Sequence, residues 1–177
     1  MDLLLKGKKV FISGSTKGIG FETARLFLEE GATVIINGRT KKSVESALSS
    51  LNSDNVSGLV ADFLKDSQVE TLIDHIPNDI DILVNNVGIF RGKEFKDETI
   101  DDWNDHFKVN LMSGVQLSKH FLPEMIKRNW GRIIFISSEC ATLVPSDLLS
   151  YSVSKASINV FSSGLAKLTK GTNVTIN

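Results

Sequence analysis

The 177-residue sequence has a single cysteine, Cys140, and no long hydrophobic run. One thiol cannot form an internal disulfide, so the chain needs no oxidising compartment in order to fold. No apolar stretch approaches the roughly 20 residues that a membrane-spanning helix requires. The first residues, Met-Asp-Leu-Leu-Leu-Lys, are too few for a signal peptide. We therefore expect a cytoplasmic protein that does not use a membrane as a partner.

An excess of one charge is also missing. The sequence has 20 Lys and Arg against 21 Asp and Glu, a net charge of −1, and no basic run. Nucleic-acid-binding proteins usually carry a basic stripe, so nucleic acid is not an expected partner. The three histidines, His75, His106 and His120, lack the spacing of metal ligands with cysteine or carboxylates. No metal site is predicted.

A glycine-rich turn follows the first apolar run of the sequence. Residues 10–12 have the composition of a buried strand, and Gly14, Gly18 and Gly20 come next in the pattern Gly-x3-Gly-x-Gly. In such a turn Gly14 allows the bend, Gly18 lets backbone approach a pyrophosphate, and Gly20 lets helix and strand pack closely. Backbone N–H groups and the positive end of a helix dipole then favour an anion. The alternative is a glycine-rich turn with no ligand.

Strand-like and helix-like segments alternate along the rest of the chain. Most of the strands are apolar throughout, as in a sheet that is covered on both faces. The alternation predicts a single α/β domain, a doubly wound parallel sheet with helices on both faces, in which ligands bind at the carboxyl ends of the strands. Strands are expected at residues 10–12, 33–36, 56–61, 80–84, 132–136 and 174–176, and helices from the glycine turn to Gly31 and at 43–51, 67–76, 99–122 and 151–168.

Residues after the second and third predicted strands indicate the nucleotide. An NAD site usually has an acid about 20 residues beyond the glycines, but no Asp or Glu lies between Glu30 and Glu45. Arg39 and Lys17 instead offer two cations that suit a 2′-phosphate, which favours NADP over NAD; the alternative is that both are solvated surface cations. Asp62 is either an acceptor for an adenine amino group or an ordinary loop carboxylate. The residues of the second turn that are assigned to this nucleotide are Asn37, Arg39 and Thr40.

The chemistry is predicted after the fifth strand. Tyr151 and Lys155 are four residues apart and so share one face of a helix. A free tyrosine has a pKa near ~10, and a neighbouring ammonium favours the phenolate, which makes a usable general acid/base. The Ser138 hydroxyl can hold a carbonyl oxygen on which charge develops. An isolated Tyr-x3-Lys is more often a half-buried tyrosine beside a lysine, but here the serine and the glycine turn accompany it.

Taken together, the sequence resembles the short-chain dehydrogenases/reductases, and in particular the 3-oxoacyl-(acyl-carrier-protein) reductases. The resemblance implies a Rossmann-type fold, a nicotinamide cofactor and the interconversion of a carbonyl and an alcohol of a small molecule. It covers the whole chain, and it depends on five motifs in the family's order and spacing: Ser13-Gly14-Ser15-Thr16-Lys17-Gly18-Ile19-Gly20, Asn85-Asn86-Val87-Gly88, Asn110, Ser138, and Tyr151 to Lys155.

The resemblance also implies residue roles. Tyr151 is then the general acid/base, Ser138 orients the substrate oxygen, and Lys155 lowers the tyrosine pKa and holds the nicotinamide ribose. Asn110 supports a water that relays protons to the lysine. Family members pair through their long helices, so a homodimer or homotetramer is expected. The implied cofactor-binding residues are Gly14, Ser15, Thr16, Lys17, Gly18, Ile19, Gly20, Asn37, Arg39, Thr40, Asp62, Asn86, Gly88, Tyr151 and Lys155.

Two features depart from the family pattern. Val87 replaces the usual alanine of Asn-Asn-Ala-Gly, an exchange of small apolar residues. The sequence also stops at Asn177, where a substrate-covering lid and a last strand would follow, so the domain is expected to be incomplete at this end, either as a fragment or as a natural truncation. Two other classes remain as alternatives: a non-catalytic nucleotide-binding or interaction protein, and a phospho-receiver or flavin module. The clustered acids of a receiver are absent after the first strand.

Overall fold

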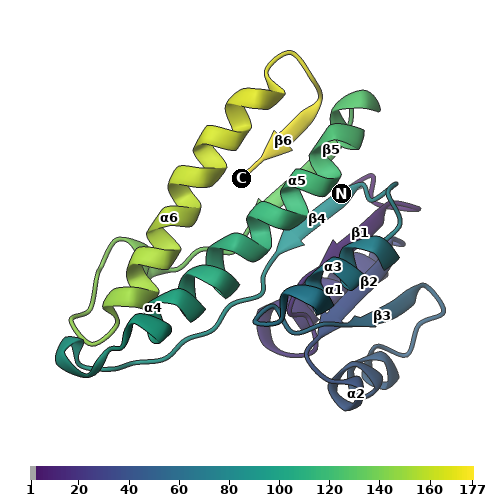
Figure 1. The fold of residues 1–177 in the computed structure, drawn as a ribbon. Helices are drawn as coiled ribbons and strands as arrows, with labels where there is room; N and C mark the ends of the chain where they lie inside the picture. The colour runs from purple at the N-terminus through teal and green to yellow at the C-terminus, as the bar shows by residue number, and fades with distance from the viewer. Residues whose placement is uncertain (1–2) are drawn as a thin grey trace.

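The six predicted strands form one parallel sheet in the computed structural model, which describes residues 3–177. The strand order is β3-β2-β1-β4-β5-β6, and every pair is parallel (Figure 1). β1 lies between β2 and β4, so the chain reverses its direction of winding at β1. The bounds are β1 (Lys9–Ile12), β2 (Thr33–Gly38), β3 (Val56–Val60), β4 (Ile82–Asn85), β5 (Gly131–Phe135) and β6 (Val174–Ile176).

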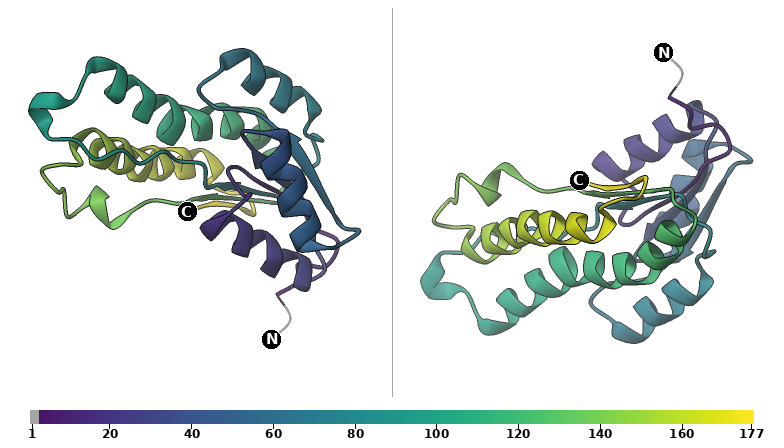
Figure 2. Two further views of the ribbon diagram at one scale, coloured as in Figure 1. Left: turned by 90° about the horizontal axis from the view of Figure 1, so that it is seen from below. Right: turned by 90° about the horizontal axis from the view of Figure 1, so that it is seen from above.

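Helices cover both faces of the sheet, as the alternating pattern predicts. Figure 2 shows α1 (Gly18–Glu29) and α2 (Lys41–Leu51) on one side. The other side carries α3 (Asp66–His75), α5 (Ser113–Lys127) and α6 (Leu149–Ala166). The fold is therefore the doubly wound, Rossmann-type sheet that the sequence indicates.

Alternate side chains of the central strands belong to two separate hydrophobic cores. Val10 and Ile12 pack with Ala24 of α1, whereas Phe11 between them packs with Leu117 and Phe121 of α5. All of these side chains are at most 1% exposed. Complete burial of such a side chain is worth about 1.5–3 kcal/mol. The apolar run of β1 therefore stabilises both layers, and it fixes the position of the glycine turn that follows.

The long helix predicted from Thr99 is interrupted. Its start is the expected capping box: Thr99 Oγ1 accepts from Asp102 N at 3.2 Å, and Asp102 Oδ2 accepts from Thr99 N at 2.9 Å. After α4 (Ile100–His106), however, a wider π-helical turn over Phe107–Met112 precedes α5. Pro123 lies inside α5, one turn before its end at Lys127. Helical periodicity in the sequence did not distinguish one continuous helix from two joined by such a turn.

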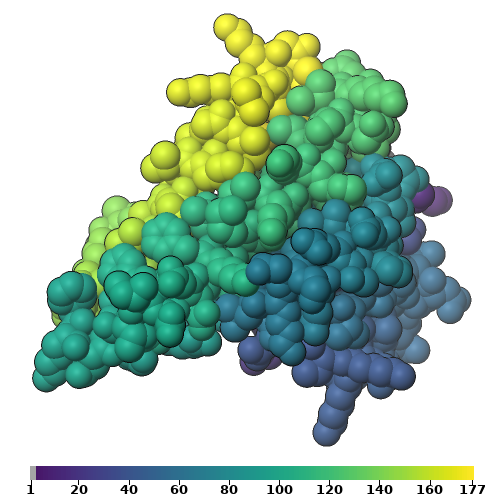
Figure 3. All heavy atoms as spheres, viewed as in Figure 1, coloured from purple at the N-terminus to yellow at the C-terminus, as the bar shows by residue number. Residues whose placement is uncertain are grey.

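The last strand pairs on one side only. β6 lies along β5, with Val174 opposite Gly131, and has no second neighbour among residues 3–177. In space-filling view, the teal region that includes α4 projects at the lower left of the molecule (Figure 3). No helix within residues 3–177 has both the length and the apolar character to cross a membrane.

Candidate functional site

A cavity of about 730 Å³ opens at the carboxyl ends of β1, β2 and β4. This is the switch point of the sheet, where doubly wound folds bind their ligands. The volume is within the usual range for small-molecule and cofactor sites. The predicted cofactor residues that line it are Gly14, Thr16, Lys17, Gly18, Asn37, Arg39, Thr40, Asp62, Asn86 and Gly88.

The glycine turn has the geometry that its spacing predicts. Gly14 and Gly18 have φ values of +61° and +59°, a conformation that residues with a side chain rarely adopt. A Cβ at Gly20 would overlap the Asn86 amide and come within 2.9 Å of the Gly14 carbonyl oxygen. At Gly18, by contrast, a Cβ would meet nothing within 4 Å. The backbone at Gly18 is thus open to a ligand, while Gly20 allows helix and turn to pack together.

Two asparagine side chains hold this turn from either side. From β2, Asn37 Oδ1 accepts from Gly14 N at 3.1 Å. Directly after β4, Asn86 Nδ2 donates to the carbonyl oxygens of Ser13 and Gly14 at 3.0 and 2.8 Å. The Ser13 hydroxyl, which sequence reasoning left unassigned, accepts from Asn86 N at 3.0 Å. These bonds leave the turn with a defined shape before any ligand binds.

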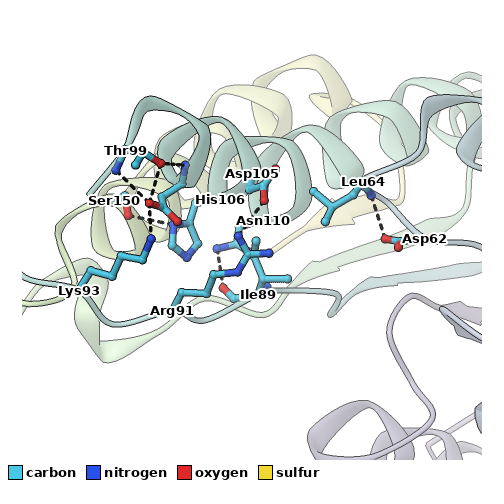
Figure 4. Close-up of polar contacts among 11 residues, drawn as sticks. Asp62, Leu64, Ile89, Arg91, Lys93, Thr99, Asp105, His106, Asn110 and Ser150 are labelled. Carbon is cyan, nitrogen blue, oxygen red and sulfur yellow. Dashed lines mark hydrogen bonds and ion pairs between the residues drawn. The ribbon is translucent and has the colours of Figure 1, made fainter. Parts of the chain in front are cut away.

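Several predicted cofactor residues make structural contacts, and the lining of the cavity does not include Ser15, Ile19, Gly20, Tyr151 or Lys155. The Ser15 hydroxyl is buried and donates to Ile12 O at 2.6 Å. Ile19 is 65% exposed, and Gly20 lies beneath Asn86. One oxygen of Asp62 accepts from Leu64 N at 3.1 Å, so this carboxylate also shapes its own loop (Figure 4). Thr40 caps α2 by accepting from Ser43 N at 3.2 Å.

Lys155 is buried beside the cavity. Its side chain comes from α6, is 5% exposed, and donates through Nζ to Ile136 O at 2.8 Å. It forms no ion pair with any other residue in the described part of the chain. Burial lowers the pKa of Lys155 from 10.5 to about 8, because the charged form loses its hydration. At neutral pH the amine is still mostly protonated.

Asn110 connects three segments around this lysine. It lies in the π-helical turn and is 4% exposed. Its side chain bonds both backbone groups of Ile89: Oδ1 accepts from Ile89 N at 2.8 Å and Nδ2 donates to Ile89 O at 3.1 Å (Figure 4). The same Nδ2 donates to the Ser154 hydroxyl at 2.9 Å. Ser154 in turn donates to Tyr151 O at 2.6 Å, so Asn110 is joined to the helix of Tyr151 and Lys155.

Tyr151 and Ser138 lie on neighbouring elements. Tyr151 is half-buried in the first turn of α6, and its ring contacts Phe90 edge to face, with centroids 5.0 Å apart. Ser138 follows β5 and begins a 3-10 turn, Glu139–Ala141, that packs against α6. The Ser138 hydroxyl accepts from Cys140 N at 3.2 Å. Its own proton therefore remains available to donate.

The segment after β4 is fixed along α4 by ion pairs. Arg91 pairs with Asp105 at 2.8 Å (Figure 4). Lys93 pairs with Asp102 at 2.6 Å. The hydrogen bond from Lys93, together with those from Thr99, holds the pKa of the Asp102 carboxyl well below its usual range. Because residues 89–91 line the cavity, these pairs position part of its wall.

Sequence reasoning missed a buried polar cluster next to Tyr151. The Ser150 hydroxyl lies 2.5 Å from Glu98 Oε1 and 2.9 Å from His106 Nδ1. Ser150 is completely buried and His106 is 1% exposed. Because Ser150 is completely buried, its hydroxyl is not accessible as a nucleophile, so the cluster is not that of a hydrolase. His106 and Glu98 lie 44 and 52 positions before Ser150, and no local pattern in the sequence indicates that they meet.

No group of three or more His, Cys, Asp or Glu side chains within residues 3–177 is arranged to hold a metal ion. The histidines of the described chain instead bond to neighbouring protein groups. His75 bonds to Thr71 O, His120 to Asn78 and His106 to Ser150.

Comparison with known families gives a match over nearly the whole chain. A family model described as short chain dehydrogenase matches residues 8–177. An oxidoreductase of Bacillus subtilis (strain 168), named YvrD and described as uncharacterized, is 46% identical over 180 residues, which cover 100% of this chain and 68% of the relative. The 3-oxoacyl-[acyl-carrier-protein] reductase FabG of Aquifex aeolicus (strain VF5) is 34% identical, over 100% of this chain and 74% of that protein.

Solved structures show the same fold. L-sorbose reductase from Gluconobacter frateurii, complexed with NADPH and L-sorbose, superposes with a TM-score of 0.93 and 28% sequence identity. The match covers 100% of this chain and 70% of that one. This chain therefore spans about 70% of the length of the proteins that it matches.

Proposed function

The chain belongs to the short-chain dehydrogenase family, and from this premise we propose that it is an NADP(H)-dependent oxidoreductase that interconverts a carbonyl and an alcohol. The family supports an enzyme that acts on CH–OH or C=O groups with NAD(P). The choice of NADP and the roles of individual residues are parts of the proposal.

The observation that carries the proposal is the position of Gly88. This residue lines the cofactor cavity, and a Cβ built on it would lie 3.4 Å from Lys155 Nζ and 3.3 Å from Asn110 Oδ1. Gly88 thus connects the cavity that the glycine turn lines with the proposed catalytic helix, whose Lys155 lies next to it. An amine and an amide next to Gly88 in the wall of a nucleotide-sized cavity are suited to the hydroxyl groups of a ribose.

The described residues fit a dinucleotide. The open backbone at Gly18 and the N-terminus of α1, whose N-cap residue Lys17 makes no side-chain capping bond, suit a pyrophosphate. Gly88, next to the buried Lys155, would lie along the nicotinamide ribose. A bound nicotinamide supplies or accepts the hydride, and the protein contributes position and electrostatics.

Two cations support NADP over NAD. Lys17 and Arg39 both line the cavity, both are exposed, and neither forms an ion pair among residues 3–177. Side chains that are not neutralised by a carboxylate are free to bind a 2′-phosphate. The NADPH complex of the related L-sorbose reductase agrees with this choice.

Proton transfer is assigned to Tyr151. In the reductive direction its phenol donates a proton to the carbonyl oxygen of the substrate, and in the oxidative direction the phenolate accepts it back. Ser138, whose own proton is uncommitted, donates a hydrogen bond to the same oxygen. The buried ammonium of Lys155 stabilises the phenolate electrostatically, and its low-dielectric surroundings strengthen that effect. Asn110 holds the Ile89 backbone and α6 in register around this site.

The test is Tyr151→Phe in the full-length protein, assayed with NADPH and a panel of 3-oxoacyl thioesters, keto sugars and steroid ketones. We expect carbonyl reduction to fall by about 10²-fold or more, while the Kd of NADPH stays near the wild-type value. Wild-type turnover by the variant would refute the assignment of Tyr151. Tight NADPH binding without reduction of any carbonyl by the wild-type protein would indicate a non-catalytic nucleotide-binding protein. Homo-oligomerisation and a cytoplasmic location stay predictions of the resemblance.

A further inference from the structure

We propose that Glu98, Ser150 and His106 form a positioning unit that holds Tyr151 in its catalytic orientation. The proposal rests on the proposed function, because it takes Tyr151 as the general acid/base. None of the three residues touches the cofactor cavity. They act through the first turn of α6 and through the ring of Tyr151.

The hydrogen-bond distances assign the protons in this unit. Ser150 has one hydroxyl proton, and its 2.5 Å contact with Glu98 Oε1 is the length of a bond from a hydroxyl to a carboxylate. The proton of Ser150 is therefore directed to Glu98. His106 Nδ1, 2.9 Å from the same hydroxyl oxygen, must then be the donor to Ser150. His106 consequently carries a proton on Nδ1.

Glu98 also caps the helix that carries Tyr151. Leu148, the N-cap residue of α6, supplies no side-chain cap. Glu98 Oε1 accepts from Ser150 N at 3.2 Å, which satisfies one of the free N–H groups of the first turn. A carboxylate at this end also interacts favourably with the helix dipole. The position of α6 along its axis thus depends on a residue 52 positions earlier in the chain.

The Tyr151 ring contacts two aromatic neighbours. Its centroid is 6.0 Å from that of His106, with the rings at 68°, and 5.0 Å from that of Phe90, with the rings at 79°. Both arrangements are edge-to-face, a favoured geometry for aromatic pairs. His106, the last residue of α4, is anchored by its bond to Ser150, so it presents a fixed wall to the tyrosine.

The electrostatic surroundings favour the neutral ring. Burial is the largest cause that lowers the pKa of His106, and the charge of Arg91 lowers it further. The carboxylates of Glu98, Asp102 and Asp105 act in the opposite direction but do not reverse the shift. His106 Nε2 has no hydrogen-bond partner among the described residues, and neither does Glu98 Oε2. A proton on Nε2 would therefore be buried without an acceptor.

Three substitutions test the unit in the full-length protein. His106→Phe keeps a ring but removes the donor to Ser150, and Ser150→Ala removes the link itself. Each is expected to lower kcat for carbonyl reduction by about 10- to 100-fold, as small misplacements of catalytic groups do, with the Kd of NADPH unchanged. His106→Asn, which retains a donor at the position of Nδ1 but lacks the ring, is expected to restore part of kcat. The control is His75→Phe, an exposed histidine on α3.

The double variant His106→Phe/Ser150→Ala is expected to be no slower than either single variant, because residues that act as one unit are not additive. Three outcomes would overturn the proposal. His106→Phe could keep the wild-type kcat, or it could lose kcat and NADPH affinity equally. The third is that His106→Asn restores no activity. If Tyr151→Phe abolishes turnover while His106→Phe does not affect it, the positioning unit fails and the proposed function stands. Retained turnover in Tyr151→Phe instead refutes the proposed function.

The tautomer supplies a readout that needs neither a substrate nor a folded variant. Nitrogen NMR of the wild-type protein at neutral pH should show His106 with a protonated Nδ1 and an unprotonated Nε2. A proton on Nε2, or a doubly protonated ring, would contradict the unit.

Discussion

The side-chain amide of Asn110 donates a 2.9 Å hydrogen bond to the hydroxyl of Ser154, which joins the π-helical turn before α5 to the helix of Tyr151. The two residues are 44 positions apart in the sequence, and Ser154 is completely buried. Because Asn110 also bonds both backbone groups of Ile89, its side chain is a structural tie as well as a candidate part of the site.

Asn110→Ala should therefore destabilise the fold. The substitution leaves the Ile89 backbone groups without a partner and removes the donor to the Ser154 hydroxyl, at a cost of about 2 kcal/mol. Urea denaturation followed by circular dichroism measures the loss. Asn104→Ala, at an exposed position of α4, is the matched control and should stay within about 0.5 kcal/mol of wild type. Equal stability of the two variants would show that the tie contributes little.

Lys155→Met should stabilise the cofactor-free protein at neutral pH while it abolishes activity. The folded protein holds the Lys155 proton up to about pH 8, whereas the unfolded chain keeps it to 10.5. Below pH 8 both states are protonated and the full cost of burying the charge is present; from 8 to 10.5 the unfolded state binds more protons, so wild-type stability rises with pH. Lys155→Met removes this cost but also loses the hydrogen bond to Ile136 O. Its free energy of unfolding should therefore exceed that of wild type by about 2 kcal/mol at pH 7.

That gain should shrink as pH rises through this window and vanish above pH 10.5. The measurement is the difference in urea unfolding midpoint between Lys155→Met and wild type at about pH 7, 9 and 10.5. Lys42→Met, at an exposed lysine, provides the comparison and should show no such trend. A pH-independent difference between Lys155→Met and wild type would mean that burial does not perturb this amine.

Gly20→Ala and Gly164→Ala should have opposite effects on stability. A Cβ at Gly20 collides with the Asn86 amide and lies 2.9 Å from backbone atoms of the turn, so we expect a loss of about 2 kcal/mol and weaker NADPH binding. Gly164 lies inside α6, and a Cβ there would meet nothing within 4 Å, so alanine should add about 0.5–1 kcal/mol. Thermal unfolding measures the changes in stability, and NADPH fluorescence titration measures the change in binding. Unaltered NADPH binding by Gly20→Ala would contradict the role of Gly20 in packing the helix against the turn.

Arg39→Ala should change the cofactor preference. Loss of one charged hydrogen bond to a 2′-phosphate is expected to raise the Kd of NADPH about tenfold or more, with no change for NADH. Isothermal titration with both nucleotides gives the ratio. Lys170→Ala, an exposed cation far along the chain after α6, controls for the general loss of a positive charge. A parallel weakening of NADPH and NADH would argue against a 2′-phosphate at Arg39.

The sequence was sufficient for features that are encoded locally. Apolar runs indicated all six strands, the capping box at Thr99 is present with both of its bonds, and Gly31 has the positive φ of a residue that ends a helix. Each of these depends on neighbours within a few positions. The positions of Gly14 and Gly20 in the turn could be anticipated for the same reason, because the strand before them and the helix after them are both visible in the sequence.

Long-range polar contacts were outside the reach of sequence patterns. Asn86 was predicted to line the cofactor site, yet its amide also bonds carbonyl oxygens of residues 72 and 73 positions away. His106 was considered only as a metal ligand, and its bond to Ser150 depends on how α4 and α6 pack. Such partners are set by the tertiary structure, and neither residue type nor spacing reveals them.

The π-helical turn keeps the buried faces of α4 and α5 on the same side. Nineteen positions separate Asp102 from Phe121, and at about 100° per residue an unbroken α-helix would leave them about 100° apart around its axis. Both are nevertheless buried, at 7% and 1% exposure. The extra residue of the wider turn takes up that rotation. Deletion of a single residue from 107–112 would therefore turn either the inward stripe of α4 or that of α5 toward solvent.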